Sequence, residues 1–189
     1  GAEYEADGIA GRIKLKTKKI PKKRRFEADV ATGDNNHFGT GNKQFSMYYG
    51  ERLSDKFGIQ STFSFQDFVF NKQKDKFKSG SYSEENTFES KPTRNMTGIV
   101  EMANYYKSGH NEVKFIYMDT DEDKTKTLTK YKKNSTAAKE YENEWEDKQK
   151  VTKGVSVGNH HRFTAATKVE SSVGFYQTNE QKDKTKRKY

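Results

Sequence analysis

Histidine is the residue of this chain best suited to chemistry, because imidazole both ligates metals and titrates near neutral pH. The chain has 4 histidines, and the adjacent pair is His160 and His161. Neighbouring residues of a strand point to opposite faces, so these two rings are poorly placed to ligate one metal ion together. We interpret both as polar turn residues, and we predict no metal site and no cofactor.

Two further motifs have the residue types of ligand-binding loops. The acidic run "DTDED" at 119–123 lacks the Gly and the terminal Glu of an EF-hand calcium loop. We interpret it as a solvated, acidic strand end. The stretch "GTGNK" at 39–43 is too short and wrongly spaced for a phosphate-binding loop, so we expect a loop that closes a hairpin. With no cysteine nucleophile and no Ser-His-acid signature, the sequence predicts a protein that is not an enzyme.

The composition of the 189 residues is polar for a folded chain: 30% are hydrophobic, 33% are charged, and the mean hydropathy is -1.20. Low hydrophobicity with a net charge of +9 is typical of disorder. The 13 Phe and 11 Tyr argue against disorder, because aromatic residues favour strands, and the low number of prolines, 2, agrees with this. No apolar run approaches the ~18 residues of a transmembrane helix, and no secretory signal is present.

The basic charge raises the question of a nucleic-acid partner. Basic residues cluster at 18–25 and 182–188, and elsewhere they are interspersed with acids rather than gathered into one stripe. We therefore expect no nucleic-acid partner. A basic β-protein that binds DNA or RNA remains the third hypothesis, and it requires steeply salt-dependent binding.

Apolar and polar residues alternate with a period of two, which is typical of strands with one apolar and one polar face. The stretches with this pattern are 26–30, 45–49, 57–70, 112–118 and 165–176. Helical periodicity is nearly absent. Its one candidate is 136–148, "TAAKEYENEWEDK", where Tyr141 and Trp145 are four residues apart, and there we expect a short helical turn on a loop.

The predicted links between strands alternate in length. "GERLSDKFG", "YKSGHNEV" and "GNHHRFTA" are short, whereas 34–43, 71–94 and 121–150 are long and charged. Tight turns at one rim and long polar loops at the other are typical of an outer-membrane β-barrel. The fold class we predict is therefore all-β, an antiparallel up-and-down meander that is part of a transmembrane barrel. A soluble sheet packed on one face would show the same alternation, so only the loop asymmetry favours the membrane.

The chain also resembles part of a TonB-dependent outer-membrane receptor. "DGIAGRIKLKTKK" at 7–19 is similar to the end of that family's plug domain, although Ala10 stands where a second Gly is usual. "GTGNKQFSMYYGERLSDKFGIQSTFSFQD" is similar to the first barrel hairpin. "YYKSGHNEVKFIYMDTDED" and "EWEDKQKVTKGVSVGNHHRF" resemble later strands and loops, in the family's order.

The resemblance implies two parts: residues 1–23 as the end of the plug and a linker, and residues 24–189 as the N-terminal part of a barrel. About seven strands are expected of the family's 22, with "KDKTKRKY" as a charged loop. The chain would be a fragment that lacks the segment contacting TonB. The implied function is uptake of a scarce nutrient, of the siderophore, cobalamin or glycan class, across the bacterial outer membrane. Implied partners are outer-membrane lipid, TonB and an unknown small nutrient.

Some expectations stay open between two interpretations. Trp145, on a predicted outer loop, either contacts a ligand or packs the loop. Four tyrosines are either aromatic-belt residues at the membrane interfaces or ordinary strand aromatics; they are Tyr49, Tyr105, Tyr106 and Tyr117. The cluster at 18–25 lies either at the periplasmic rim or in a solvated linker. The alternative to a receptor is a soluble antiparallel β-barrel that acts as a binding module.

Overall fold

In a computed structural model, every regular element of the described residues is a strand. The described residues are 3–5, 12–14, 19–35, 40–77, 82–132 and 138–189. The strands are β1 (Glu3–Glu5), β2 (Arg12–Lys14), β3 (Arg25–Asn35), β4 (Thr40–Arg52), β5 (Phe57–Phe77), β6 (Tyr82–Tyr106), β7 (Gly109–Lys132), β8 (Ala138–Arg162) and β9 (Lys168–Lys188). Within these ranges, no helix is long and apolar enough to cross a membrane.

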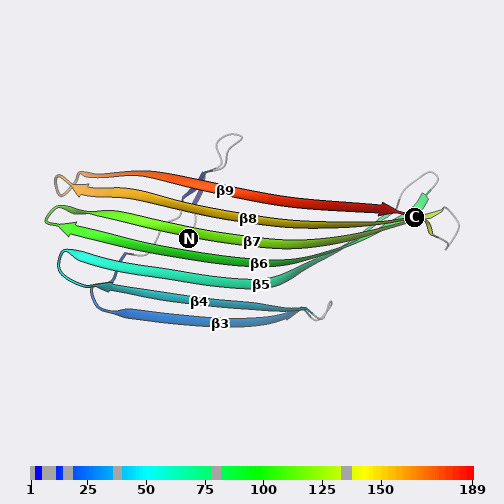
Figure 1. The fold of residues 1–189 in the computed structure, drawn as a ribbon, viewed down its shortest axis with the longest axis horizontal. Helices are drawn as coiled ribbons and strands as arrows, with labels where there is room; N and C mark the ends of the chain where they lie inside the picture. Colours follow the sequence, from blue (N-terminus) through cyan, green and yellow to red (C-terminus); the bar gives the residue numbers. More distant parts are fainter. Residues whose placement is uncertain (1–2, 6–11, 15–18, 36–39, 78–81, 133–137) are drawn as a thin grey trace.

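Strands β3 to β9 form one seven-stranded sheet in chain order, each antiparallel to the strand before it (Figure 1). This confirms the predicted all-β up-and-down meander and its number of strands. Among the described residues, β3 and β9 each pair on one side only, so the sheet is open. Whether it is part of a barrel stays a prediction.

Strands β1 and β2 form a separate antiparallel pair, in which Tyr4 lies opposite Ile13. Strand β2 covers the Arg12–Lys14 part of the stretch that resembles a plug domain. Residues 6–11 and 15–18, which carry most of that motif, lie outside the described residues.

The tight turns are confirmed, and they gather at one end of the sheet, which we call the hairpin end. They comprise Leu53–Lys56, Lys107–Ser108 and Phe163–Thr167. Hydroxyl groups stabilise two of these turns. The Ser54 hydroxyl accepts a hydrogen bond from the Phe57 amide at 3.1 Å, and the Thr164 hydroxyl accepts one from the Thr167 amide at 2.9 Å. Such side-chain bonds are why Ser and Thr favour turns.

The prediction of long loops at the other end is wrong, because those segments are extensions of the strands. Strands β5 and β6 stay paired from Asn71↔Ser90 to Phe77↔Glu84, and β7 and β8 pair throughout 121–130. Only residues 36–39, 78–81 and 133–137 remain between strands there. The segments contain few apolar residues, so a search for apolar alternation misses them, although their Thr residues favour strands.

Three local expectations are corrected in the same way. The helical turn predicted at 136–148 is wrong, because β8 runs from Ala138 to Arg162 and contains Trp145. A spacing of four residues also keeps two side chains on one face of a strand, so Tyr141 and Trp145 fit either structure. The C-terminal charged loop is strand β9 as far as Lys188, and Thr40–Lys43 of "GTGNK" belongs to β4 rather than to a loop.

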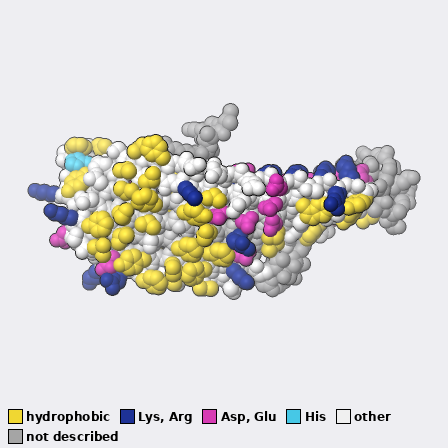
Figure 2. Space-filling view, in the orientation of Figure 1, with side chains coloured by type: hydrophobic (Ala, Val, Ile, Leu, Met, Phe, Trp, Pro, Cys, Tyr) yellow, Lys and Arg dark blue, Asp and Glu magenta, His cyan; other side chains and the backbone are white. Residues whose placement is uncertain are grey.

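The register gives the sheet two chemically different faces. The central row of paired residues is Phe26, Tyr49, Ser61, Val100, Phe115, Val155 and Phe175. The rows beside it on the same face add residues such as Met47, Phe63, Val113 and Val173. We call this the apolar face; Figure 2 shows its hydrophobic side chains over the half nearest the hairpin end, with acidic side chains beyond them.

No second layer covers the apolar face within the described residues. The exposed fraction is 74% for Phe175 and 59% for Val173. Among the residues whose burial the structure describes, the buried hydrophobic ones are Ile20 and Ala103. Most large apolar side chains on this face are therefore left to contact something other than the described chain.

The opposite face, which we call the polar face, carries an ion-pair lattice far from the hairpin end. Glutamates at alternate positions of β8 meet lysines at alternate positions of β9. The Nζ–Oε1 distances are 2.9 Å for Lys182–Glu146, 2.9 Å for Lys184–Glu144, 2.6 Å for Lys186–Glu142 and 3.6 Å for Lys188–Glu140. Lys130 of β7 also meets Glu140, at 3.0 Å. We call this part of the sheet the charged extension; it comprises residues 121–130 of β7, 140–150 of β8 and 180–188 of β9.

Candidate functional site

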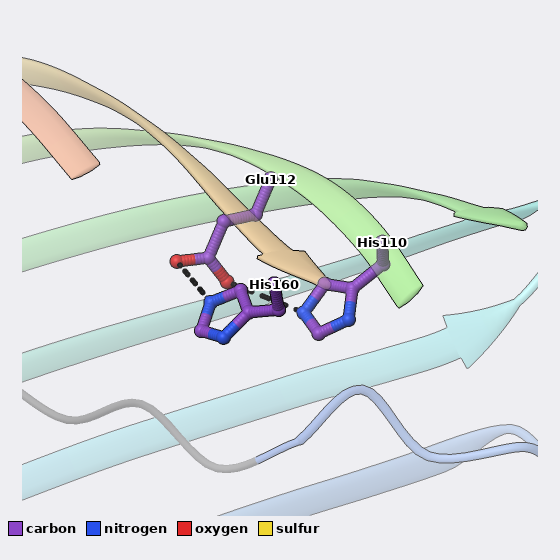
Figure 3. Close-up of side chains that lie close together, drawn as sticks. All are labelled: His110, Glu112 and His160. Atoms are coloured by element: carbon purple, nitrogen blue, oxygen red, sulfur yellow. Dashed lines mark ion pairs between the residues drawn. The ribbon is translucent and has the colours of Figure 1, made fainter. Parts of the chain in front are cut away.

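Three potential metal ligands meet on the polar face beside the hairpin end. His110 and Glu112 are two residues apart on β7, so both point to the same face. His160 of β8 lies directly opposite His110 in the sheet register. One ligand atom from each residue lies within 4.8 Å of the others (Figure 3). Two strands therefore bring together residues that are 50 positions apart in sequence.

The Glu112 carboxylate lies beside the two imidazoles and faces one nitrogen of each. Its Oε1 is 3.5 Å from Nε2 of His160, and its Oε2 is 3.8 Å from Nε2 of His110. The two rings stack, with centroids 4.4 Å apart and planes inclined by 9°. Figure 3 shows both nitrogens directed at the carboxylate. The cluster thus holds two imidazole nitrogens and a carboxylate close together on one face of the sheet.

A second carboxylate fixes the other side of His160. Oε1 of Glu170, on β9, lies 3.3 Å from Nδ1 of His160, and Glu170 is also paired with Lys168. The hydrogen bond from Lys168, followed by that from His160, lowers the pKa of Glu170 to about 2. Glu170 is therefore ionised at neutral pH and accepts a hydrogen bond from Nδ1 of His160.

Lysine neutralises the buried acids of the cluster. Nζ of Lys114 donates to Oε1 of Glu112 at 2.6 Å and lies 3.6 Å from Oε2 of Glu101, whose exposed fraction is 4%. Burial, followed by the charge of His160, lowers the pKa of His110. His110 therefore favours its neutral form.

The sequence analysis placed His160 and His161 on opposite faces, and this is confirmed, although both lie in β8 rather than in a turn. His161, on the apolar face, stacks on Tyr106 with centroids 5.8 Å apart. The sequence analysis did not find His110 or Glu112, because their meeting with His160 depends on the register between strands. The available signal was the spacing "HNE", which places two ligand types on one face of a strand.

The other candidate residues are scattered over the sheet. The acidic run Asp119–Asp123 lies within β7 and not at its end, and its side chains alternate between the two faces. Arg94 pairs with Asp121 at 3.9 Å, while Lys91 pairs with Glu122 at 2.8 Å. This run therefore forms no single ligand cluster.

The aromatic residues divide between the faces according to the register. Tyr49, Tyr106 and Tyr117 share the apolar face, whereas Tyr105 lies on the polar face, with its ring centroid 5.4 Å from that of His110. Trp145 lies in β8 and has the guanidinium of Arg187 5.9 Å from its ring centroid, so it packs within the sheet. Neither position tests whether these residues contact lipid or ligand.

The basic cluster at 18–25 is described from Lys19 onward. Arg24 pairs with Glu51 at 2.9 Å, next to the first tight turn. The hydrogen bond and charge of Glu51 raise the pKa of Arg24, so the pair is ionised at neutral pH. The cluster thus lies at the hairpin end, where β3 begins.

No protein-family model, no curated protein and no solved structure matches the chain.

Proposed function

We propose that the chain is part of a TonB-dependent outer-membrane receptor, a transporter that takes up a scarce nutrient. In this proposal the apolar face contacts lipid, and the polar face lines the barrel interior. The observation that carries the proposal is that the apolar face of these strands, opposite a polar one, is left uncovered by the described residues. A transmembrane barrel requires this alternation of apolar and polar side chains along every strand.

The height of the apolar face supports a membrane location. On β5 it extends from Phe57 to Phe65, about nine residues, which is the length of a transmembrane β-strand. At about 3.4 Å per residue and a tilt of ~40°, this stretch spans roughly 23 Å, close to the ~25 Å apolar band of such barrels. The next row on this face carries Asp67, Arg94 and Asp121, where a membrane interface would begin.

Three charged residues of the sheet lie inside this band on the apolar face: Glu51 in the row of Ile59, Lys153 in the row of Phe63 and Asp119 in the row of Phe65. Glu51 and Asp119 lie toward the two ends of the band, and Lys153 lies nearest its centre. Nζ of Lys153 is 5.9 Å from the ring centroid of Tyr117. A long lysine side chain can keep its ammonium group near a polar interface while its methylene groups stay in apolar surroundings. The position of Lys153, one row from the centre, is therefore compatible with lipid contact.

The segment before β3 supports the proposal from the other side of the sheet. A Cβ added at Gly58 would lie 3.0 Å from Cγ2 of Ile20, and one added at Gly50 would lie 2.8 Å from Cδ of Pro21. Gly50 and Gly58 belong to the polar face. The end of the proposed plug and linker, residues 1–23, thus lies against the face that a closed barrel would enclose.

The open edges of the sheet also fit a part of a larger barrel. Unpaired backbone groups along β3 and β9 are costly in lipid, so further strands would have to pair with them. The substrate class, the coupling to TonB and the outer-membrane location rest on the sequence resemblance alone.

Neighbouring cysteine substitutions on β9 test the proposal, since the chain has no cysteine of its own. Val173→Cys lies on the apolar face and Ser172→Cys on the polar face. Each variant is labelled with an environment-sensitive fluorophore and refolded with vesicles of bacterial outer-membrane phospholipid. We expect a blue-shifted emission for the label at 173 and a water-like emission for the label at 172.

A water-like emission from both labels favours the soluble binding module. If both labels report water and the chain is folded and monodisperse in buffer without detergent or lipid, the membrane proposal is wrong. Circular dichroism under both conditions shows whether the strands are formed in each measurement.

A further inference from the structure

We propose that His110, Glu112 and His160 bind a zinc ion on the polar face. Two imidazole nitrogens and one carboxylate are a ligand set that zinc takes up in proteins. The proposal depends on the pairing of β7 with β8, and it does not require the sheet to lie in a membrane. It would stand even if the chain were a soluble binding module.

The backbone positions the three ligands before any ion arrives. His110 and His160 face each other across an antiparallel pair, and Glu112 follows His110 on the same face. Around a tetrahedral zinc with bonds of about 2.1 Å, ligand atoms lie about 3.4 Å from one another. The distances of 3.5 Å and 3.8 Å from the Glu112 oxygens to His160 and His110 are close to this value. The two rings are stacked nearly parallel, so they have to rotate out of the stack to direct both nitrogen lone pairs at one ion.

Glu170 gives His160 the tautomer that metal binding requires. A carboxylate that accepts the Nδ1 proton leaves the Nε2 lone pair free, and this arrangement is common behind metal-bound histidines. Oε1 of Glu170 is 3.3 Å from Nδ1 of His160, while Nε2 of the same ring points at Glu112. Lys168 in turn holds Glu170 in place. Three adjacent strands thus contribute to one site.

Three protein ligands leave the fourth tetrahedral position open to water or to another ligand. The exposed fraction of the side chain is 30% for His110 and 25% for His160, so solvent reaches the site. Lys114 occupies one side of Oε1 of Glu112 and leaves Oε2 available. Its ammonium group competes with a cation, which limits the affinity.

The test is calorimetric titration of the metal-stripped full chain with zinc chloride. We expect one zinc per chain. His160→Ala removes a ligand and should weaken binding by more than about 100-fold, beyond the ~10–100-fold cost of losing an outer partner. The matched control is His161→Ala, which removes the neighbouring imidazole on the apolar face and should change the affinity by less than about 3-fold.

Two isosteric variants complete the design. Glu112→Gln should lose most of the affinity, and Glu170→Gln should weaken binding by about 10-fold through the orientation of His160. Both keep the side-chain volume, so they give a result even if His160→Ala does not fold by circular dichroism. Equal weakening by His160→Ala and His161→Ala, unchanged binding in Glu112→Gln, or no zinc binding by the unaltered chain would each overturn the proposal.

Discussion

The hairpin end and the charged extension are halves of the same strands, yet different forces shape them. Near the hairpins, one face carries Phe, Val and Tyr while the other carries the His110–Glu112–His160 cluster. In the charged extension, the polar face alternates Lys and Glu across strands. On the other face of the extension Asp123, Asp147 and Asp183 lie side by side. One half therefore presents apolar surface to its surroundings, whereas the other is adapted to water on both faces.

We expect the largest loss of stability when a charge is placed at the centre of the apolar face. In lipid vesicles, Val155→Lys should destabilise the folded chain by about 2–4 kcal/mol, the cost of a lysine at the bilayer midplane. Ser156→Lys, its neighbour on the polar face, should cost less than about 1 kcal/mol. Urea unfolding in vesicles measures both. An equal loss of folding stability in the two variants would show that both faces are in the same environment and would contradict lipid contact.

A change of pH should affect the charged extension next most strongly. Hydrogen bonds from Lys186 and Lys182 lower the pKa of Glu142 and Glu146 below 4.5. Since each pKa is lower in the folded chain, the ionised pairs stabilise the fold at pH values above 4.5. That contribution is lost as the pH falls from 4.5 through the lowered pKa.

Hydrogen exchange, corrected for the intrinsic effect of pH, measures this loss strand by strand. We expect amides of 140–148 and 180–188 to lose protection at acidic pH before those of 151–158 do. Uniform loss along β8 would show that the two halves unfold as one unit and would remove the distinction between them.

The smallest effect comes from a single ion pair. Glu142→Gln removes the acidic partner of Lys186, leaves Lys188 with Glu140 alone, and should destabilise the fold by about 1 kcal/mol. Asp147→Asn is the control, because Asp147 lies opposite Asp123 and Asp183, and its neutralisation relieves repulsion. Denaturant midpoints of both variants at low and high salt distinguish the loss of an ion pair from the relief of repulsion. A loss of stability in Asp147→Asn as large as that in Glu142→Gln would show that the pairing on the polar face is not specific.

The sequence predicted one half of this fold better than the other, for a physical reason. Contrast between apolar and polar residues is visible in a single strand, so stretches such as 57–65 were assigned correctly. The strands of the charged extension are defined by charges on neighbouring strands, as in Glu144 opposite Lys186 with Lys184 beside it. That pattern appears only once two strands are aligned, so 121–150 was taken for a loop and 136–148 for a helical turn.

The candidate site shows the same limit. Residues within one strand can be placed by counting, so the opposite orientations of His160 and His161 were predictable. The contact between His110 and His160 requires the register of β7 against β8, which depends on the packing of several rows of side chains across the two strands. No rule based on a single stretch of sequence supplies it.

The Lys–Glu lattice also has a consequence for how strand β9 finds its place. Lys184 lies within 4.0 Å of both Glu144 and Glu146, and Lys188 lies within 3.6 Å of both Glu140 and Glu142. A slip of β9 by two residues would exchange these partners and keep most of the charge complementarity. The lattice therefore holds the strands together without specifying their alignment. Correct alignment has to come from the short turn at Phe163–Thr167 and the side chains beside it, so we expect misaligned forms to accumulate when that turn is lengthened.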